Sequence, residues 1–211
     1  RKYALAWGIG IAWQEEIDAV NILNATFRAM SRAVLALAAT GAACAEADER
    51  GPDSVFSLPP LIIDGNHSIP EAQWKLAGEY ACPDFALLTL EKLAAVEGVD
   101  KGPEFVSGGS SGVPGLFGAK HVCSFPLPEQ HFLVQGDSLC HAISAASLLA
   151  QTTRDAIMAG LEPLFPGYAF AEHKGYGTAT HLAALEAHGP CALHRMTFRT
   201  VRPEERQLTL I

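Results

Sequence analysis

The sequence predicts an α/β fold in which helices pack on a sheet. Short apolar segments that read as strands alternate with longer segments that read as helices. Two of the short segments, 61–64 and 132–137, each end at an aspartate next to a glycine, and residues 17–39 carry apolar positions three and four residues apart. Together these observations indicate one sheet with helices on its faces.

The first two elements follow from two different periodicities. Apolar residues alternate with small ones from Tyr3 to Ile11, which predicts a strand. Apolar positions then recur at helical spacing from Ile17 to about Ala39, which predicts an amphipathic helix. Gly41 is the expected end of that helix.

The next two strands each deliver a carboxylate. The segment LIIDGN reads as a buried strand that ends at Asp64, and FLVQGD reads as a second strand that ends near Asp137. Between them, residues 72–129 fit no regular pattern. We interpret this stretch as an insertion that contains a helix within 80–99 and a mobile Gly/Ser/Pro loop over 102–118.

Two helices complete the predicted fold. One begins near Ser144 with small residues and is broken by Pro163 and Pro166. The other covers 178–188, with Thr178 as its N-cap and Gly189 just past its end. We expect residues 1–211 to form a single domain.

The composition is that of a globular protein. The chain has 211 residues, of which 49% are hydrophobic, and no apolar run approaches the roughly 20 residues of a membrane-spanning helix. Five cysteines without any CxxC pair argue against a disulfide framework or a zinc site. The start lacks the long apolar stretch of a signal peptide. We therefore expect a soluble, cytoplasmic protein with reduced thiols, acting as a monomer without a membrane partner.

The net charge of −8 argues against a generally basic nucleic-acid coat. The end of the chain nevertheless carries a local basic strip, with Lys174 upstream of it. A solvated tail is the alternative interpretation of the strip. Its arginines are Arg195, Arg199, Arg202 and Arg206.

Asp64 and Asp137 are the candidate metal ligands. Carboxylates gathered at the ends of neighbouring strands repel one another unless a cation neutralises them. Oxygen ligands suit Mg²⁺ or Mn²⁺, and such ions can activate a water for attack on a phosphodiester. The alternative is that Asp-Gly and Gly-Asp here are only turn residues that follow a strand.

Nine motifs, in order, resemble ribonuclease HII, the type 2 ribonuclease H. The resemblance covers residues 1–75 and 130–203, and it implies a ribonuclease H-like mixed sheet flanked by helices. The motifs are EIDAVNIL (16–23), IIDGN (62–66), GDS (136–138), ISAASLLA (143–150), TRD (153–155), FPGY (165–168), HKGYGT (173–178), HGP (188–190) and HRMTF (194–198).

The resemblance implies a role for three residues. Asp64 and Asp137 stand where the family has its third and fourth metal-binding carboxylates. Tyr176 stands where the family stacks a tyrosine on the sugar at the junction between a ribonucleotide and the next deoxynucleotide. An aromatic ring in a glycine-bounded loop suits stacking, although a core or surface tyrosine is the alternative.

Four further residues are candidate nucleic-acid contacts. Ser144 and Ser147 lie near a predicted helix start, where hydroxyls and free backbone N–H groups can hold phosphate; N-capping and close helix packing are the alternatives. Lys174 and Arg195 are candidates on charge alone. Histidines without tight ligand spacing do not predict zinc, and Asp155 is expected to form a structural ion pair rather than to bind metal.

The sequence also departs from the family pattern. Nothing matches the Asp-Glu pair and Gly-Arg-Gly loop of the family's opening strand, which supply the other metal ligands and recognise the ribose 2′-OH. We interpret the chain as lacking its first strands, and a degenerate, inactive relative is the alternative. Gln135 replaces a lysine and Gly177 replaces a proline, changes that are expected to weaken phosphate binding and loosen the tyrosine loop.

The expected function is that of a metal-dependent endonuclease, with Mg²⁺ or Mn²⁺ as cofactor. Its substrates would be the RNA strand of RNA–DNA hybrids and the 5′ side of ribonucleotides embedded in duplex DNA. The rival interpretation is a catalytically incomplete remnant that still binds nucleic acid.

Overall fold

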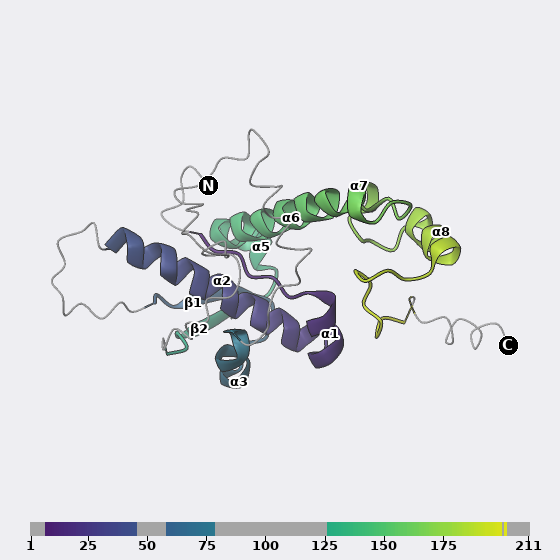
Figure 1. The fold of residues 1–211 in the computed structure, drawn as a ribbon. Helices are drawn as coiled ribbons and strands as arrows, with labels where there is room; N and C mark the ends of the chain where they lie inside the picture. Colours follow the sequence, from purple (N-terminus) through teal and green to yellow (C-terminus); the bar gives the residue numbers. More distant parts are fainter. Residues whose placement is uncertain (1–6, 46–57, 79–125, 200, 202–211) are drawn as a thin grey trace. The chain divides into compact units, whose positions relative to one another are not determined.

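A computed structural model describes residues 7–45, 58–78, 126–199 and 201, which divide between two compact units. The described part of unit 1 comprises residues 7–12, 23–45, 58–78 and 126–149. That of unit 2 comprises residues 13–22, 150–199 and 201. Each unit is described by itself below, with the labels of Figure 1.

Strands β1 (Leu61–Asp64) and β2 (Gln130–Leu133) form the parallel sheet of unit 1. Leu61 pairs with Gln130 and Asp64 with Leu133, so both strands end in register. The Gln130 side chain bonds both backbone groups of Ile69, accepting from its N at 2.7 Å and donating to its O at 3.1 Å. The α/β class and the strand that ends at Asp64 are therefore confirmed. The second predicted strand, 132–137, is present but shifted, because β2 ends at Leu133 and the chain then turns into a helix before Asp137.

Helix α2 (Ile22–Ala45) contributes to the hydrophobic core of unit 1. Phe27 of this helix packs with Ile63 of β1, with Ile69 and with Trp74 of α3 (Glu71–Lys75). Figure 1 shows α2 running beside the two strands and α3. Burying four large apolar side chains stabilises the unit by about 1.5–3 kcal/mol for each.

The strand expected over 3–11 is not present in its described part, because residues 7–12 pair with no strand there. They instead run against α2. A Cβ atom on Gly10 would lie 1.8 Å from Ala29 O, and one on Gly8 would lie 2.2 Å from Ala33 O. The alternation of small and large residues thus reflects close packing of glycines on a helix, with Ile9 buried between them.

The helix predicted from Ile17 to about Ala39 is present but divided. Helix α1 (Gln14–Val20) ends at Asn21, whose φ of 69° interrupts the helix before α2 begins. Its ψ of 164° lies outside the left-handed α region, so the backbone at Asn21 is strained. Gly41 does not end α2, which continues to Ala45, so that boundary prediction was wrong. A single helical glycine costs only about 1 kcal/mol relative to alanine.

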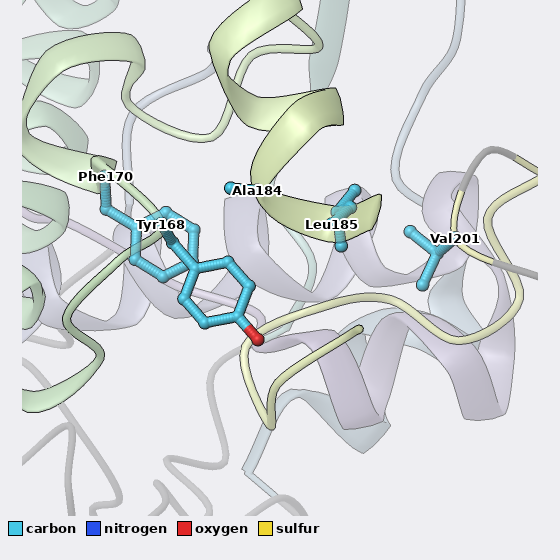
Figure 2. Packing of buried hydrophobic residues seen from close by; sticks show 5 residues of the cluster. All are labelled: Tyr168, Phe170, Ala184, Leu185 and Val201. Carbon is cyan, nitrogen blue, oxygen red and sulfur yellow. The ribbon is translucent and has the colours of Figure 1, made fainter. Parts of the chain in front are cut away.

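In unit 2, aromatic side chains form the core. Tyr168 stacks on Phe170 of α7 (Phe170–His173), with ring centroids 5.3 Å apart and planes 6° apart. Figure 2 shows the two rings side by side with Ala184 and Leu185, which project from α8 (Ala179–His188), and with Val201. This cluster therefore joins α7, α8 and the C-terminal residues of the described chain.

The ends of α6 and α8 and the start of α8 match the sequence prediction, whereas α6 begins at His141, before the predicted start near Ser144. Helix α6 (His141–Leu161) ends immediately before the short 3-10 helix η2 (Glu162–Leu164), which contains Pro163. Thr178 caps α8 by accepting a hydrogen bond from His181 N at 3.3 Å. Gly189 follows α8 with a φ of 73°, a conformation that glycine adopts without strain.

Most of the expected insertion, residues 79–125, lies outside the described residues. Its first residues, 72–78, belong to α3 and to the 3-10 helix η1 (Leu76–Gly78). Trp74 and Ala77 are buried there.

Among the described cysteines, Cys140 and Cys191 are free thiols. Within the ranges that the structure describes, no helix is long and apolar enough to cross a membrane.

Candidate active site

The carboxylate of Asp64 is held against the backbone that follows β2. Because β1 and β2 are parallel, their carboxyl ends meet at the same edge of the sheet. Gly65 N donates to Leu133 O at 3.1 Å, and Gly136 N donates to Asp64 Oδ1 at 2.9 Å. The residue after that donor is Asp137, so the fold brings Asp64 directly to the chain segment that carries the second predicted carboxylate.

Gly136 leaves no room for a side chain at this junction. A Cβ atom there would lie 2.5 Å from Ile143 Cδ1 and 3.3 Å from Asp64 Oδ1. Gln135, just before it, has a φ of 57° and turns the chain from β2 into the short helix α5 (Gly136–Leu139). The Gly-Asp motif is therefore both turn chemistry and the support of the Asp64 carboxylate.

Asp137 lies exposed in α5, close to the start of α6. Ser138 Oγ donates to Asp137 Oδ1 at 3.4 Å, and Ser144 Oγ donates to the Asp137 backbone carbonyl. Ser147 follows Ser144 by one turn of α6 and is half-buried. The structure thus connects Asp64, Asp137 and Ser144 through hydrogen bonds, whereas Ser147 shares only the helix.

The two carboxylates are suitable oxygen donors for a hard divalent cation. Asp64 uses one carboxylate oxygen for Gly136 N, which fixes the orientation of the other. Both side chains are exposed, so solvent and a phosphate can reach them. Among the described residues, no group of three or more His, Cys, Asp or Glu side chains could hold a metal ion. The assignment of Asp64 and Asp137 as metal ligands therefore stays a prediction.

Tyr176 lies in unit 2, on the loop between α7 and α8, and its side chain is 58% exposed. The guanidinium carbon of Arg154 lies 4.7 Å from the centroid of its ring. Tyr176 N donates to His173 O at 2.8 Å, and Thr178 N donates to Tyr176 O at 2.8 Å. The loop thus presents an aromatic ring to solvent from a hydrogen-bonded turn.

The two predicted cationic contacts have structural partners of their own. Lys174 adopts a φ of 53° at the end of α7, and its ammonium donates to the Ala171 carbonyl. The guanidinium carbon of Arg195 lies 4.5 Å from the centroid of the Phe198 ring. Arg202 and Arg206 lie outside the described residues. The structure therefore shows local contacts for both Lys174 and Arg195, and their role toward nucleic acid stays a prediction.

Asp18 joins α1 to the segment that carries Arg195. Its carboxylate accepts hydrogen bonds from Met196 N at 2.7 Å, from Thr197 N at 3.0 Å and from Thr197 Oγ1. Burial alone would raise the pKa of Asp18, but these bonds and the charge of Arg195 outweigh it, so the pKa lies below its usual 3.8.

The expected structural ion pair of Asp155 is also present, with Arg154 Nε donating to Asp155 Oδ1 at 2.7 Å.

A buried histidine cluster next to the Tyr176 loop was not predicted from the sequence. His173 and His181 stack with ring centroids 4.3 Å apart, and His181 Nε2 lies 3.0 Å from His194 Nε2. Burial lowers the pKa of both His181 and His194 below 6.5. The spacing of these residues gave no signal, because only the turn between α7 and α8 and the packing of the 191–194 segment bring them together.

Comparison with known proteins identifies the family. A sequence model of ribonuclease HII matches residues 124–201. The ribonuclease HII of Nitratidesulfovibrio vulgaris is 39% identical over an alignment that covers 100% of this chain and 69% of that protein. Those of Oleidesulfovibrio alaskensis and Hyphomonas neptunium are 37% and 36% identical over 96% of this chain, and the alignments cover 57% and 70% of their lengths.

The fold agrees with that match. Helices combined with a small parallel sheet are consistent with the ribonuclease H-like α/β fold of these relatives. The family model covers β2, the Gly-Asp turn, α6 and the Tyr176 loop. On this sequence identity and coverage, the chain belongs to the ribonuclease HII family, the type 2 ribonuclease H hydrolases.

Proposed function

We propose that the protein is a metal-dependent endonuclease that cleaves the RNA strand of RNA–DNA hybrids and the 5′ side of ribonucleotides embedded in duplex DNA. The observation that carries the proposal is the hydrogen bond from Gly136 N to Asp64 Oδ1. This bond joins the end of β1, which carries Asp64, to the start of α5, which carries Asp137. In this role the protein would act as a monomer in the cytoplasm. It would remove ribonucleotides from DNA, which is a form of DNA repair.

Asp64 and Asp137 are the residues that would hold Mg²⁺ or Mn²⁺. When bound, such an ion activates a water and stabilises the charge that develops on the phosphodiester oxygens. Asp64 orients its free oxygen through the bond to Gly136 N, and Asp137 stands exposed one residue later. Hydrolysis would leave 5′-phosphate and 3′-hydroxyl ends.

The remaining candidates would bind the nucleic acid. Ser144 and Ser147 lie in the first two turns of α6, and their hydroxyls are the groups proposed to contact a phosphate, because Ser144 N already donates to Cys140 O. Tyr176 is exposed enough to stack on the sugar at the RNA–DNA junction. Lys174 and Arg195 add positive charge in unit 2, within a chain whose net charge is −8.

A second candidate function has one observation in its favour. The part of the chain that the structure describes offers no group of three or more potential metal ligands, and Asp64 and Asp137 are its two candidates. A protein limited to these ligands would bind nucleic acid through Tyr176 and nearby cations without cleaving it. Activity measurements separate the two functions.

The test is cleavage of a DNA duplex that contains one ribonucleotide, with Mg²⁺ or Mn²⁺. The 211-residue chain is assayed beside a version that includes any segment its gene encodes upstream of Arg1. We expect metal-dependent cleavage in the active version. We also expect Asp64→Asn and Asp137→Asn each to lower kcat by at least roughly 100-fold, since each removes a charged metal ligand.

The matched control is Glu71→Gln, which neutralises an exposed carboxylate at the start of α3. It is expected to leave cleavage unchanged. Full cleavage by Asp64→Asn would refute the metal-ligand assignment. Tight binding without cleavage by either version would support the binding remnant instead.

A further inference from the structure

Tyr176 has little conformational restraint from its own sequence. It stands between Gly175, whose φ is 84°, and Gly177, and a Cβ atom on Gly177 would meet no atom within 4 Å. Glycines on both sides give the backbone around Tyr176 many accessible conformations. A ring that must meet a substrate at a fixed position therefore needs support from elsewhere in the fold.

Arg154 of α6 supplies one such support. Its guanidinium carbon lies 4.7 Å from the centroid of the Tyr176 ring, a distance at which a cation is attracted to the ring face. Asp155 Oδ1 accepts from Arg154 Nε at 2.7 Å and fixes the guanidinium in turn. Burial alone would lower the pKa of Arg154, but its interactions with Tyr176 and Asp155 outweigh that effect and raise the pKa above its ordinary value.

His181 of α8 supplies a second support, at the backbone. Its Nδ1 lies 3.0 Å from Tyr176 O, to which it donates a hydrogen bond. The carbonyl of Tyr176 also accepts from Thr178 N at 2.8 Å, so it receives two donors. The His181 side chain is only 7% exposed, which shields the bond to Nδ1 from competition by water.

A directional network of neutral side chains holds His181 in that tautomer. His194 Nδ1 lies 3.0 Å from Cys191 N, 3.2 Å from Cys191 Sγ and 3.3 Å from Cys191 O; we assign it as the acceptor of the shortest of these contacts, which puts the His194 proton on Nε2. His194 Nε2 then donates to His181 Nε2 at 3.0 Å, and the His181 proton remains on Nδ1, facing Tyr176 O. Across the other face of His181 lies His173, whose Nδ1 accepts from Gly175 N at 3.1 Å.

We propose that Arg154 and His181 are positioning residues for Tyr176, holding its ring face and its carbonyl so that the ring is ready to stack on the substrate sugar. This rests on the proposed role of Tyr176 at the RNA–DNA junction. Arg154 lies over one face of the ring, and the residue remains 58% exposed, so the ring is accessible to a sugar. His181 fixes the backbone from which the ring projects.

The test measures the preference of the full-length protein for a duplex with one ribonucleotide over the same duplex made of DNA alone. Binding of both duplexes is measured by fluorescence anisotropy with Ca²⁺ in place of Mg²⁺. Arg154→Met removes the cation and keeps a long, unbranched side chain. We expect it to lower the preference roughly fivefold, the size of one cation–π contact.

The His181 variants separate positioning from mere structure. Asparagine can place its amide N–H near the position of Nδ1, whereas phenylalanine cannot donate. We expect His181→Phe to lower the preference by roughly fivefold, the value of one hydrogen bond in a shielded site, and His181→Asn to restore most of it. Thermal unfolding of each variant verifies that it folds.

The same substitutions are repeated in a Tyr176→Ala background. If Arg154 and His181 act through Tyr176, they cause no further loss there, because residues that act through one contact are not additive. Equal losses in both backgrounds would overturn the positioning role while leaving the role of Tyr176 intact. A Tyr176→Ala protein with undiminished preference would overturn both the junction role and the inference.

Discussion

The Asp18 side chain joins two segments of unit 2 that are distant in the sequence, α1 and residues 196–197. Its carboxylate accepts from the backbone of Met196 and Thr197, which lie 178 and 179 residues away in the sequence. Asp18 lies in the EIDAVNIL motif (16–23), within α1. Its bonds show that it orders the C-terminal segment and not α1 alone.

We predict that Asp18 stabilises the fold only while it is ionised. Its pKa is lower in the folded chain than the usual 3.8, so its contribution is complete above pH 3.8 and is lost as the pH falls through the folded value. Asp18→Asn is expected to lower the free energy of unfolding by about 1–2 kcal/mol at pH 7. The difference from wild type should shrink at pH 3.

Thermal unfolding at both pH values measures this effect. Glu186→Gln, at an exposed position of α8, is the control and is expected to change the midpoint little at pH 7. A gap between Asp18→Asn and wild type that persists undiminished at pH 3 would contradict the assignment.

At the scale of elements, the backbone of residues 7–12 packs closely against the backbone of α2. Gly8 and Gly10 let the backbone of this segment lie directly on the helix backbone. Arg32 of α2 strengthens the contact, since its Nη1 donates to Ile11 O at 2.7 Å. Its Nε donates to Ala77 O at 2.7 Å and so joins α2 to η1 as well.

We predict that Gly10→Ala destabilises unit 1 by about 2–3 kcal/mol. The added Cβ would lie 1.8 Å from Ala29 O and 2.6 Å from Ala33 N, and both are helix backbone atoms that cannot move without breaking α2. Urea unfolding measures the loss. Gly177→Ala is the control, because its Cβ would meet nothing within 4 Å, and a shift as large as that of Gly10→Ala would refute the packing argument.

At the scale of the whole molecule, an acidic chain is proposed to bind a polyanion. A net charge of −8 repels nucleic acid at long range, so any affinity has to come from local cations and stacking. Each phosphate neutralised by a cation adds about 0.9 to the slope of log affinity against log salt concentration. The salt dependence therefore counts the cations that touch phosphate.

We predict that Lys174→Gln and Arg195→Gln each reduce that slope by about 0.9. The measurement is a titration of an RNA–DNA hybrid at several salt concentrations. Lys75→Gln is the control, since Lys75 is exposed in α3 and paired with Glu71, and it should leave the slope unchanged. An unaltered slope in Lys174→Gln would show that its ammonium serves only the Ala171 carbonyl.

The sequence alone predicted the features that depend on neighbouring residues. Strand β1, the helix that begins near Ser144, and the Thr178 and Gly189 boundaries of α8 all follow from local periodicity, proline and capping. It also placed Asp64 at the end of a strand, whereas Asp137 lies in α5, beyond the end of β2 at Leu133. The predictions that succeeded did so because the physical causes lie within a few residues of each position.

Tertiary structure decided which of those residues meet. Local periodicity could not reveal that Gly10 lies on α2 rather than in a strand. A strand with one packed face and a segment whose glycines pack on a helix can show the same alternation of large and small residues. Nor could it place Arg154 over Tyr176 or His181 beside His194. Such contacts join residues on different elements, and only the packing of those elements brings them within reach of one another.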